Sequence, residues 1–164
     1  MLDHLKYMAE RNLFFLGGVA LGAGLALLLS MKKRNRKVIL DDRNKPGNKG
    51  FVYNKAHIID GIAHISGQVA IQYLMPEKKE VDLEEEIRQC LENLKTVVEM
   101  CGSSMDKVLK TDCLLSDIED YATFNKVYST FFSDNAIKPA RVCYAAKQLP
   151  LKARVEVACT AYVE

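Results

Sequence analysis

The sequence predicts an α+β domain in which a mixed β-sheet carries two helices packed on one face, preceded by a single transmembrane helix. Three features support this: an uncharged apolar run near the N-terminus, two amphipathic helical segments between strand-like segments, and strict apolar alternation near the C-terminus. The 164 residues allow one ordinary domain and an appendage. We expect an anchor with its basic flank at 1–37, a polar linker at 38–49 and a folded domain at 50–164.

The predicted anchor is residues 13–31, which carry no charge and would span about 28 Å as a helix, roughly the hydrocarbon thickness of a bilayer. A basic cluster at 32–37 follows, while only Lys6 and Arg11 are basic before it, so the positive-inside rule places the folded domain on the cytosolic side. We expect a single-pass protein of the mitochondrial outer membrane, with the endoplasmic reticulum as the alternative. A cleaved signal peptide competes, but the run is long for one and no small-residue cleavage site precedes the basic cluster.

The folded domain begins with a predicted β-hairpin. Asp60 and Gly61 separate two apolar runs, and this pair favours a type I′ turn, which needs positive φ at both positions. Strands are therefore predicted near 51–59 and 62–72.

Two helices are predicted after the hairpin. The first begins at an N-cap, Asp82, and stops at Gly102. Its apolar stripe comprises Ile87, Leu91, Leu94, Val98 and Cys101. The acidic run 84–86 is interpreted as compensation of the helix dipole. The second helix begins at Asp117 or Asp120 and extends to about residue 133.

Three further strands are predicted at 108–115, 141–147 and 153–163. One sheet with two helices leaves a face uncovered. Apolar residues on that face need a partner chain, so a closed homo-oligomer is expected.

Charge and composition limit the possible functions. Residues 1–49 carry 10 basic and 4 acidic side chains, a net +6, whereas residues 50–164 carry 13 and 17, a net −4. An acidic domain without Trp offers little to a phosphate backbone, so nucleic-acid binding is not expected. The five cysteines form no C-x-x-C pair, which favours reduced core thiols over disulfides or zinc. His57 and His64 would lie opposite each other across the hairpin, but two ligands make a poor metal site.

Four segments, at matching spacing, resemble the RidA/YjgF family of reactive-intermediate (enamine and imine) deaminases, which are RutC-like proteins. They are ISGQV at 65–69, the segment 89–132, KPARVCYAAKQLP at 138–150 and RVEVACTA at 154–161. The resemblance implies the chorismate-mutase-like RidA fold over 50–164 and a homotrimer with active sites between subunits. It also implies hydrolysis of 2-aminoacrylate-type enamines and 2-imino acids to 2-keto acids and ammonia, without metal or organic cofactor.

The resemblance assigns roles to individual residues. Arg141, set in an apolar run, matches the arginine that binds the substrate carboxylate, and a guanidinium can do this through two parallel hydrogen bonds. Glu156 matches the glutamate that positions and activates water. The remaining substrate-binding positions are Tyr53, Ser66, Asn125 and Cys143. Without the resemblance, Arg141 is more simply interpreted as a structural ion pair with Glu156 or another acid.

Three positions depart from the family pattern. The entrance segment GFVYNK keeps Tyr53 but lacks the usual Gly-Pro before it, Val142 replaces a small Ser or Thr, and Lys147 stands where an Arg is common. The alternative function is therefore a non-catalytic, membrane-tethered adaptor or complex subunit with the same fold. RNA cleavage, a third activity ascribed to relatives, is disfavoured by the domain's negative charge.

Overall fold

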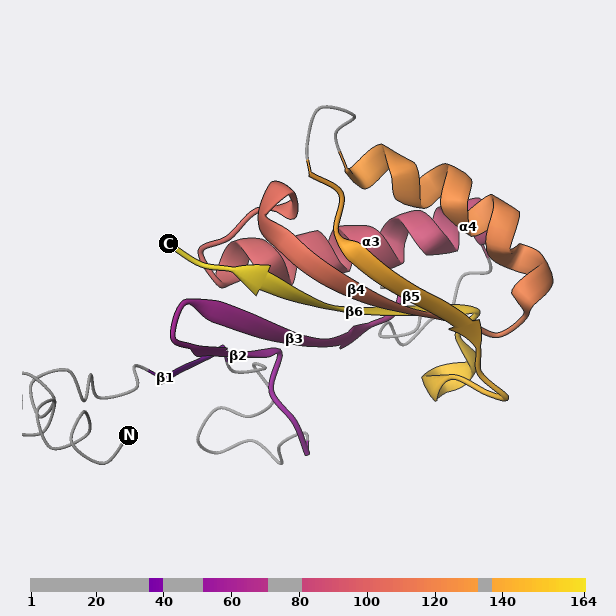
Figure 1. The fold of residues 1–164 in the computed structure, drawn as a ribbon. Helices are drawn as coiled ribbons and strands as arrows, with labels where there is room; N and C mark the ends of the chain where they lie inside the picture. The colour runs from indigo at the N-terminus through magenta and orange to yellow at the C-terminus, as the bar shows by residue number, and fades with distance from the viewer. Residues whose placement is uncertain (1–35, 40–51, 71–80, 133–136) are drawn as a thin grey trace, which may run out of the picture. The chain divides into compact units, whose positions relative to one another are not determined.

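The residues that the structure describes form a six-stranded mixed sheet with two α-helices on one face (Figure 1). The computed structural model describes residues 36–39, 52–70, 81–132 and 137–164. The strand order is β1-β2-β3-β6-β4-β5, antiparallel throughout except for the parallel pair β4–β5. The predicted α+β class with a mixed sheet is confirmed.

The strands are β1 (Arg36–Ile39), β2 (Ala56–Ile59), β3 (Ile62–Gln68), β4 (Val108–Leu115), β5 (Ala140–Ala145) and β6 (Val155–Tyr162). Among the described residues the helices are α3 (Leu83–Met100) and α4 (Tyr121–Tyr128), with short 3-10 turns at 105–107, 118–120, 129–131 and 150–152. From β2 onward the order agrees with the predicted one.

Strand β1 is the element that the sequence did not predict. Its residues fall in the expected basic flank and linker, yet they pair antiparallel with β2, and Val38 lies opposite His57. The predicted anchor, 13–31, lies outside the described residues. Among the residues that the structure does describe, no helix is both long enough and apolar enough to cross a membrane.

The hairpin and the first helix form as their local signals predict. Asp60 and Gly61 have φ of 51° and 78°, the positive values that a type I′ turn requires. Asp82 caps α3 by accepting a 2.8 Å hydrogen bond from the Glu85 amide. Gly102, just beyond the C-cap of α3, has φ of 81°.

The core lies between the helices and one face of the sheet. Its largest fully buried side chains come from α3, α4, β4 and β6 and include Phe124, Ile87, Leu91, Leu115 and Val157. Four of the five cysteines are buried there as free thiols, as expected of small core residues.

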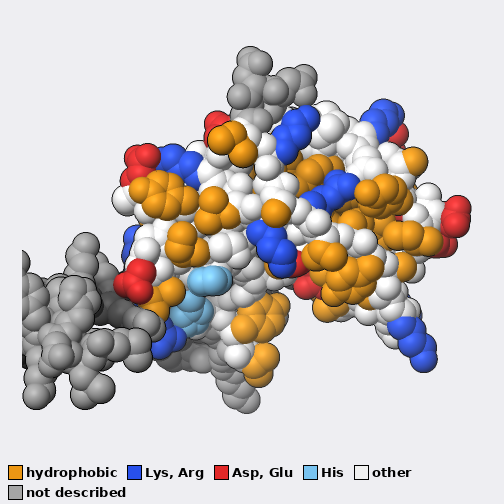
Figure 2. All heavy atoms as spheres, in the orientation of Figure 1, with side chains coloured by type: hydrophobic (Ala, Val, Ile, Leu, Met, Phe, Trp, Pro, Cys, Tyr) orange, Lys and Arg blue, Asp and Glu red, His pale blue; other side chains and the backbone are white. Residues whose placement is uncertain are grey.

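The opposite face of the sheet, here called the open face, has no helix covering it in the described residues. Val142, Tyr144 and Tyr162 remain 41%, 50% and 45% exposed. Figure 2 shows hydrophobic side chains gathered on this side of the domain, with Lys and Arg side chains among them. Exposed aromatic residues of this kind mark an interaction surface, which agrees with the expected oligomer.

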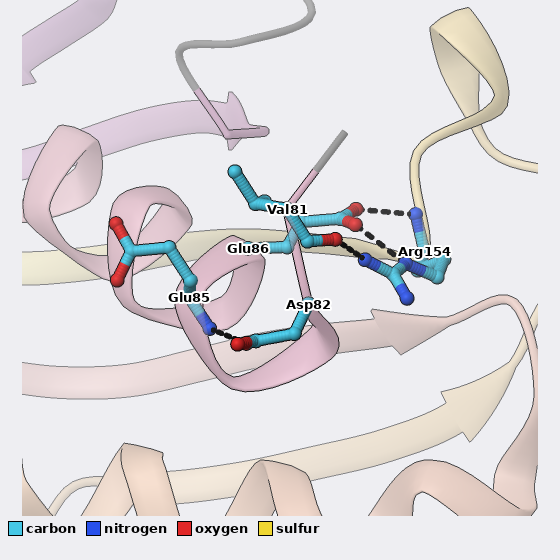
Figure 3. Close-up of polar contacts among 5 residues, drawn as sticks. All are labelled: Val81, Asp82, Glu85, Glu86 and Arg154. Carbon is cyan, nitrogen blue, oxygen red and sulfur yellow. Dashed lines mark hydrogen bonds and ion pairs between the residues drawn. The ribbon is translucent and has the colours of Figure 1, made fainter. Parts of the chain in front are cut away.

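A buried ion pair connects the start of α3 to the start of β6 (Figure 3). Glu86 is fully buried, and its carboxylate accepts hydrogen bonds from the Arg154 backbone amide at 2.7 Å and from Arg154 Nε at 2.6 Å. Arg154 Nη2 also donates to the Val81 carbonyl. The interpretation of 84–86 as dipole compensation is therefore wrong for Glu86, whose position on α3 turns it toward the sheet.

Loss of this carboxylate is expected to destabilise the fold. Glu86→Gln removes the buried negative charge that faces the Arg154 guanidinium and should lower the free energy of unfolding by about 2 to 3 kcal/mol, since Arg154 is only partly buried. Urea denaturation followed by circular dichroism measures this. Glu84→Gln is the matched control, because Glu84 pairs with Lys126 in the exposed first turn and should contribute under about 1 kcal/mol. Equal losses in both variants would contradict the special role of Glu86.

Candidate functional site

Arg141 lies on β5, which pairs with β4 at the edge of the sheet. It is directly opposite Thr111, which is fully buried on the helix side and whose hydroxyl is 2.8 Å from that of Tyr128. The Arg141 side chain therefore points toward α4. β5 is half-exposed although its sequence is an apolar run, because no strand or helix of the described chain covers its outer edge.

Aromatic rings surround the Arg141 guanidinium. Its Nη2 donates a 2.9 Å hydrogen bond to the Tyr121 hydroxyl, and its central carbon lies 4.8 Å from the ring centroid of Tyr128 and 5.5 Å from that of Tyr121. These distances allow cation–π attraction. Within the described residues no carboxylate pairs with Arg141, so the simple ion-pair interpretation fails. The cation is held in place by neutral groups.

Glu156 lies on β6 but faces the other side of the sheet. It alternates with the buried residues Val155 and Val157 and is opposite Leu114 of β4, so its half-buried carboxylate is on the open face. It packs over Gly67 so closely that a methyl group there would overlap it. Burial raises the pKa of the Glu156 carboxyl. A carboxylate with a raised pKa is better matched to accept a proton near neutral pH.

Ser66 precedes Gly67 in an irregularity between Ile65 and Gln68, where the β3–β6 register shifts. Its hydroxyl donates a 2.7 Å hydrogen bond to the Asn54 carbonyl, and its amide donates to the Lys55 carbonyl. Tyr53, half-exposed, precedes Asn54 in the same segment. The side chain of Ser66 thus attaches the entrance segment to β3, a shaping role.

Asn125 and Cys143 lie on the Arg141 side. Asn125 is half-buried on α4, four residues after Tyr121 and three before Tyr128, so it shares their helix face. Cys143 follows Arg141 on the same face of β5 and is also half-buried. Burial raises the pKa of its thiol, and the positive charge of Arg141 acts against this rise.

The predicted residues therefore divide into two groups. We call Arg141, Asn125 and Cys143 the arginine half-site, and Glu156, Ser66 and Tyr53 the glutamate half-site. Arg141 and Glu156 point to opposite faces of the sheet, so one chain does not bring them together. A groove of about 650 Å³ between α3 and the turns at 105–107 and 129–131 contains none of these six residues.

Two features of the half-sites were missed by sequence reasoning. Tyr121 carries the hydroxyl that holds Arg141, and its spacing of four from Asn125 was the available signal. Gly67 supplies the space for Glu156, which no local pattern indicates. His57 and His64 are opposite each other as predicted, and Arg36 Nη2 lies 3.1 Å from His57 Nδ1. The described residues contain no group of three potential metal ligands.

Comparison with known proteins shows the family to which this fold and these motifs belong. The family model described as endoribonuclease L-PSP matches residues 47–163, which is most of the chain. The chain belongs to the RidA/YjgF family. This agrees with the motifs around Arg141 and Glu156, and with structural similarity to a Yersinia pestis member of the Rid family.

Three relatives of this RidA/YjgF protein are informative. A human 2-iminobutanoate/2-iminopropanoate deaminase is 31% identical over 75% of this chain and 88% of its own. The mitochondrial protein mmf1 of Schizosaccharomyces pombe is 37% identical over 66% and 67%. The structure of Escherichia coli TdcF with bound serine has a TM-score of 0.65 and 28% identity, covering 78% of this chain and 100% of that one.

Gly67→Ala is expected to displace the Glu156 carboxylate toward water. The added methyl should destabilise the fold by about 1 kcal/mol, and this loss should largely disappear in a Glu156→Ala background, where the space is free. The pKa of Glu156 should fall toward its ordinary value, because displacement removes the burial that raises it. Urea denaturation and an NMR titration of the carboxyl carbon measure the two effects. An unchanged pKa, or an equal loss in both backgrounds, would contradict the packing described.

Proposed function

We propose that this RidA/YjgF protein is a membrane-anchored deaminase. It hydrolyses 2-aminoacrylate-type enamines and 2-imino acids to 2-keto acids and ammonia, in a site shared by two copies of a homotrimer. The arginine half-site of one copy binds the substrate, and the glutamate half-site of its neighbour positions the water.

The observation that carries the proposal is the environment of Arg141. Its guanidinium is half-buried against Tyr121 and Tyr128 and has no acidic partner among the described residues. A cation held this way by neutral groups is suited to a small carboxylate, which a guanidinium binds through two parallel hydrogen bonds. The serine bound to TdcF carries such a carboxylate, and so do the imino acids in the name of the human deaminase.

The chemistry requires one general base. Glu156 accepts a proton from water as the water oxygen attacks the imine carbon, which forms a carbinolamine. The protonated Glu156 passes this proton to the nitrogen, which completes the carbinolamine. Glu156 then takes the proton of the carbinolamine hydroxyl and delivers it to the nitrogen as the carbon–nitrogen bond breaks, so ammonia leaves and the hydroxyl oxygen becomes the carbonyl oxygen of the 2-keto acid. Burial favours both steps, because it raises the pKa of the carboxyl toward neutral pH.

The exposed residues of the single chain support the same arrangement. Arg141 and Glu156 are on opposite faces of one sheet, and the open face exposes Val142 and Tyr144 beside the arginine half-site. Packing of this face against a second copy would bury these side chains. It would also bring a neighbour's half-site to the β5 edge, and three copies can close the ring.

Mixing two inactive variants tests the shared site. Arg141→Ala and Glu156→Gln should each lower kcat/KM on an enzymatically generated 2-imino acid more than about 100-fold, since each removes an interaction with the reacting molecule. Subunits exchanged at equal ratio should then recover activity in about one quarter of the sites, because each such site takes an intact Arg141 from one copy and an intact Glu156 from its neighbour.

Two controls accompany this mixture. Lys147→Ala removes an exposed cation six residues after Arg141 and should leave activity unchanged. A double variant, Arg141→Ala with Glu156→Gln, mixed with either single variant should recover nothing. If the two single variants mixed together stayed inactive, both residues would belong to one protomer. If the wild type itself released no keto acid, the non-catalytic adaptor would be the better function.

In this proposal residues 13–31 form the membrane anchor, and the folded domain faces the cytosol. The mitochondrial outer membrane is the favoured location, and the endoplasmic reticulum is the alternative. The mitochondrial relative mmf1 supports the organelle. The full chain expressed in cells should stay in the membrane pellet after alkaline carbonate extraction, and deletion of 1–37 should move it to the supernatant. A full chain found in the carbonate supernatant would exclude an integral anchor.

A further inference from the structure

Two cysteines lie side by side at the edge of the sheet. Cys113 of β4 and Cys143 of β5 are direct register partners in the parallel pair. Neighbouring strands are about 4.8 Å apart, and the Cα atoms of a disulfide are usually about 4.4 to 6.8 Å apart. Both side chains point to the α4 side, because Cys113 is buried there and paired residues share a face. We propose that Cys113 and Cys143 form a reversible disulfide when the protein meets a hydroperoxide.

The two thiols differ in access. Cys143 is half-buried on an edge strand, whereas Cys113 is fully buried beneath it. A small oxidant therefore reaches Cys143 first. β5 pairs with β4 alone among the described strands, so it can move relative to β4 without breaking a second strand pairing.

Arg141 promotes the reaction through its charge. Burial raises the pKa of both thiols, that of Cys113 to about 12, and the Arg141 guanidinium acts against this rise at each of them. The fraction of Cys143 that ionises does so beside this cation, so the thiolate is less unfavourable there than burial alone would make it.

The reaction balances with hydrogen peroxide as the oxidant. The Cys143 thiolate attacks one peroxide oxygen, the sulfur–oxygen bond forms as the oxygen–oxygen bond breaks, and hydroxide leaves to take up a proton. The Cys113 thiolate then attacks the Cys143 sulfur and displaces hydroxide, which takes the proton that Cys113 lost. Two thiols are oxidised to one disulfide, and one peroxide is reduced to two waters. A dithiol such as dithiothreitol reverses the change by exchange.

The strand register favours a disulfide between Cys113 and Cys143 over one with any of the other three cysteines. Cys159 of β6 is opposite Thr111 rather than Cys113, and Cys90 and Cys101 belong to the helix layer and its end. A bond between Cys113 and Cys143 would draw β5 toward β4 directly beside Arg141. This would change the contact between the Arg141 guanidinium and the Tyr128 ring. The effect on substrate rests on the proposed function, whereas formation of the disulfide does not.

Peptide mapping tests the modification. The full-length protein in its membrane is treated with hydrogen peroxide, its remaining thiols are alkylated under denaturing conditions, and the digest is analysed by mass spectrometry. We expect a cross-linked peptide pair joining Cys113 to Cys143 in at least half of the molecules, lost after dithiothreitol. Cys143→Ser should abolish it, and Cys159→Ser, the matched control, should preserve it.

Other patterns would overturn the proposal. A different cysteine pair, a link between two chains, or sulfinic acid at Cys143 with Cys113 still alkylated would each exclude it, and the wild-type map alone shows which occurs. Deaminase activity measured in parallel tests whether the disulfide affects substrate turnover. We expect at least a five-fold loss of activity, which dithiothreitol restores. A mapped disulfide with unchanged deaminase activity would overturn only the effect of the disulfide on turnover. A protein inactive before and after treatment would refute the proposed function but not the disulfide.

Discussion

The buried pair between Glu86 and Arg154 holds together the parts of the domain on which the glutamate half-site depends. One carboxylate binds both the backbone amide and the side chain of Arg154, which fixes the start of β6 to the first turn of α3. The Arg154 carbonyl in turn accepts a hydrogen bond from the Ser116 amide at the end of β4. Glu156 follows two residues later on β6. Its place over Gly67 is therefore set by a contact with a helix on the other side of the sheet.

The alternation of a strand imposes the second constraint. Because successive side chains point to opposite faces, and β5 and β6 are both joined to β4 in fixed register, Arg141 turns toward α4 and Glu156 toward the open face. No rotamer change brings the two groups together within one chain. A site that used both would need a neighbour to complete it, so in the proposed function the geometry of the sheet links oligomerisation to chemistry.

Local signals account for most of the correctly predicted elements. The Asp60-Gly61 turn, the Asp82 cap and the alternation from Val155 onward each depend on interactions between residues close in sequence, so the pattern carries the information. β1 has no such signal: it is four residues long, half of them basic, and exists because it pairs with β2. Glu86 was misjudged for a similar reason. Three consecutive acidic residues look equivalent in the first turn of a helix, and only the docking of α3 distinguishes the one that is buried.

The sequence by itself determined the fold class, the helix and strand periods, the turn residues and, through family motifs, the identities of Arg141 and Glu156. These follow from local backbone preferences and from residue types at set spacing. The tertiary structure decided which face each of those side chains occupies, that aromatic rings rather than an acid hold Arg141, and that Cys113 lies beside Cys143. Each of these depends on strand register and helix docking, which join residues far apart in the chain and leave no local trace in the sequence.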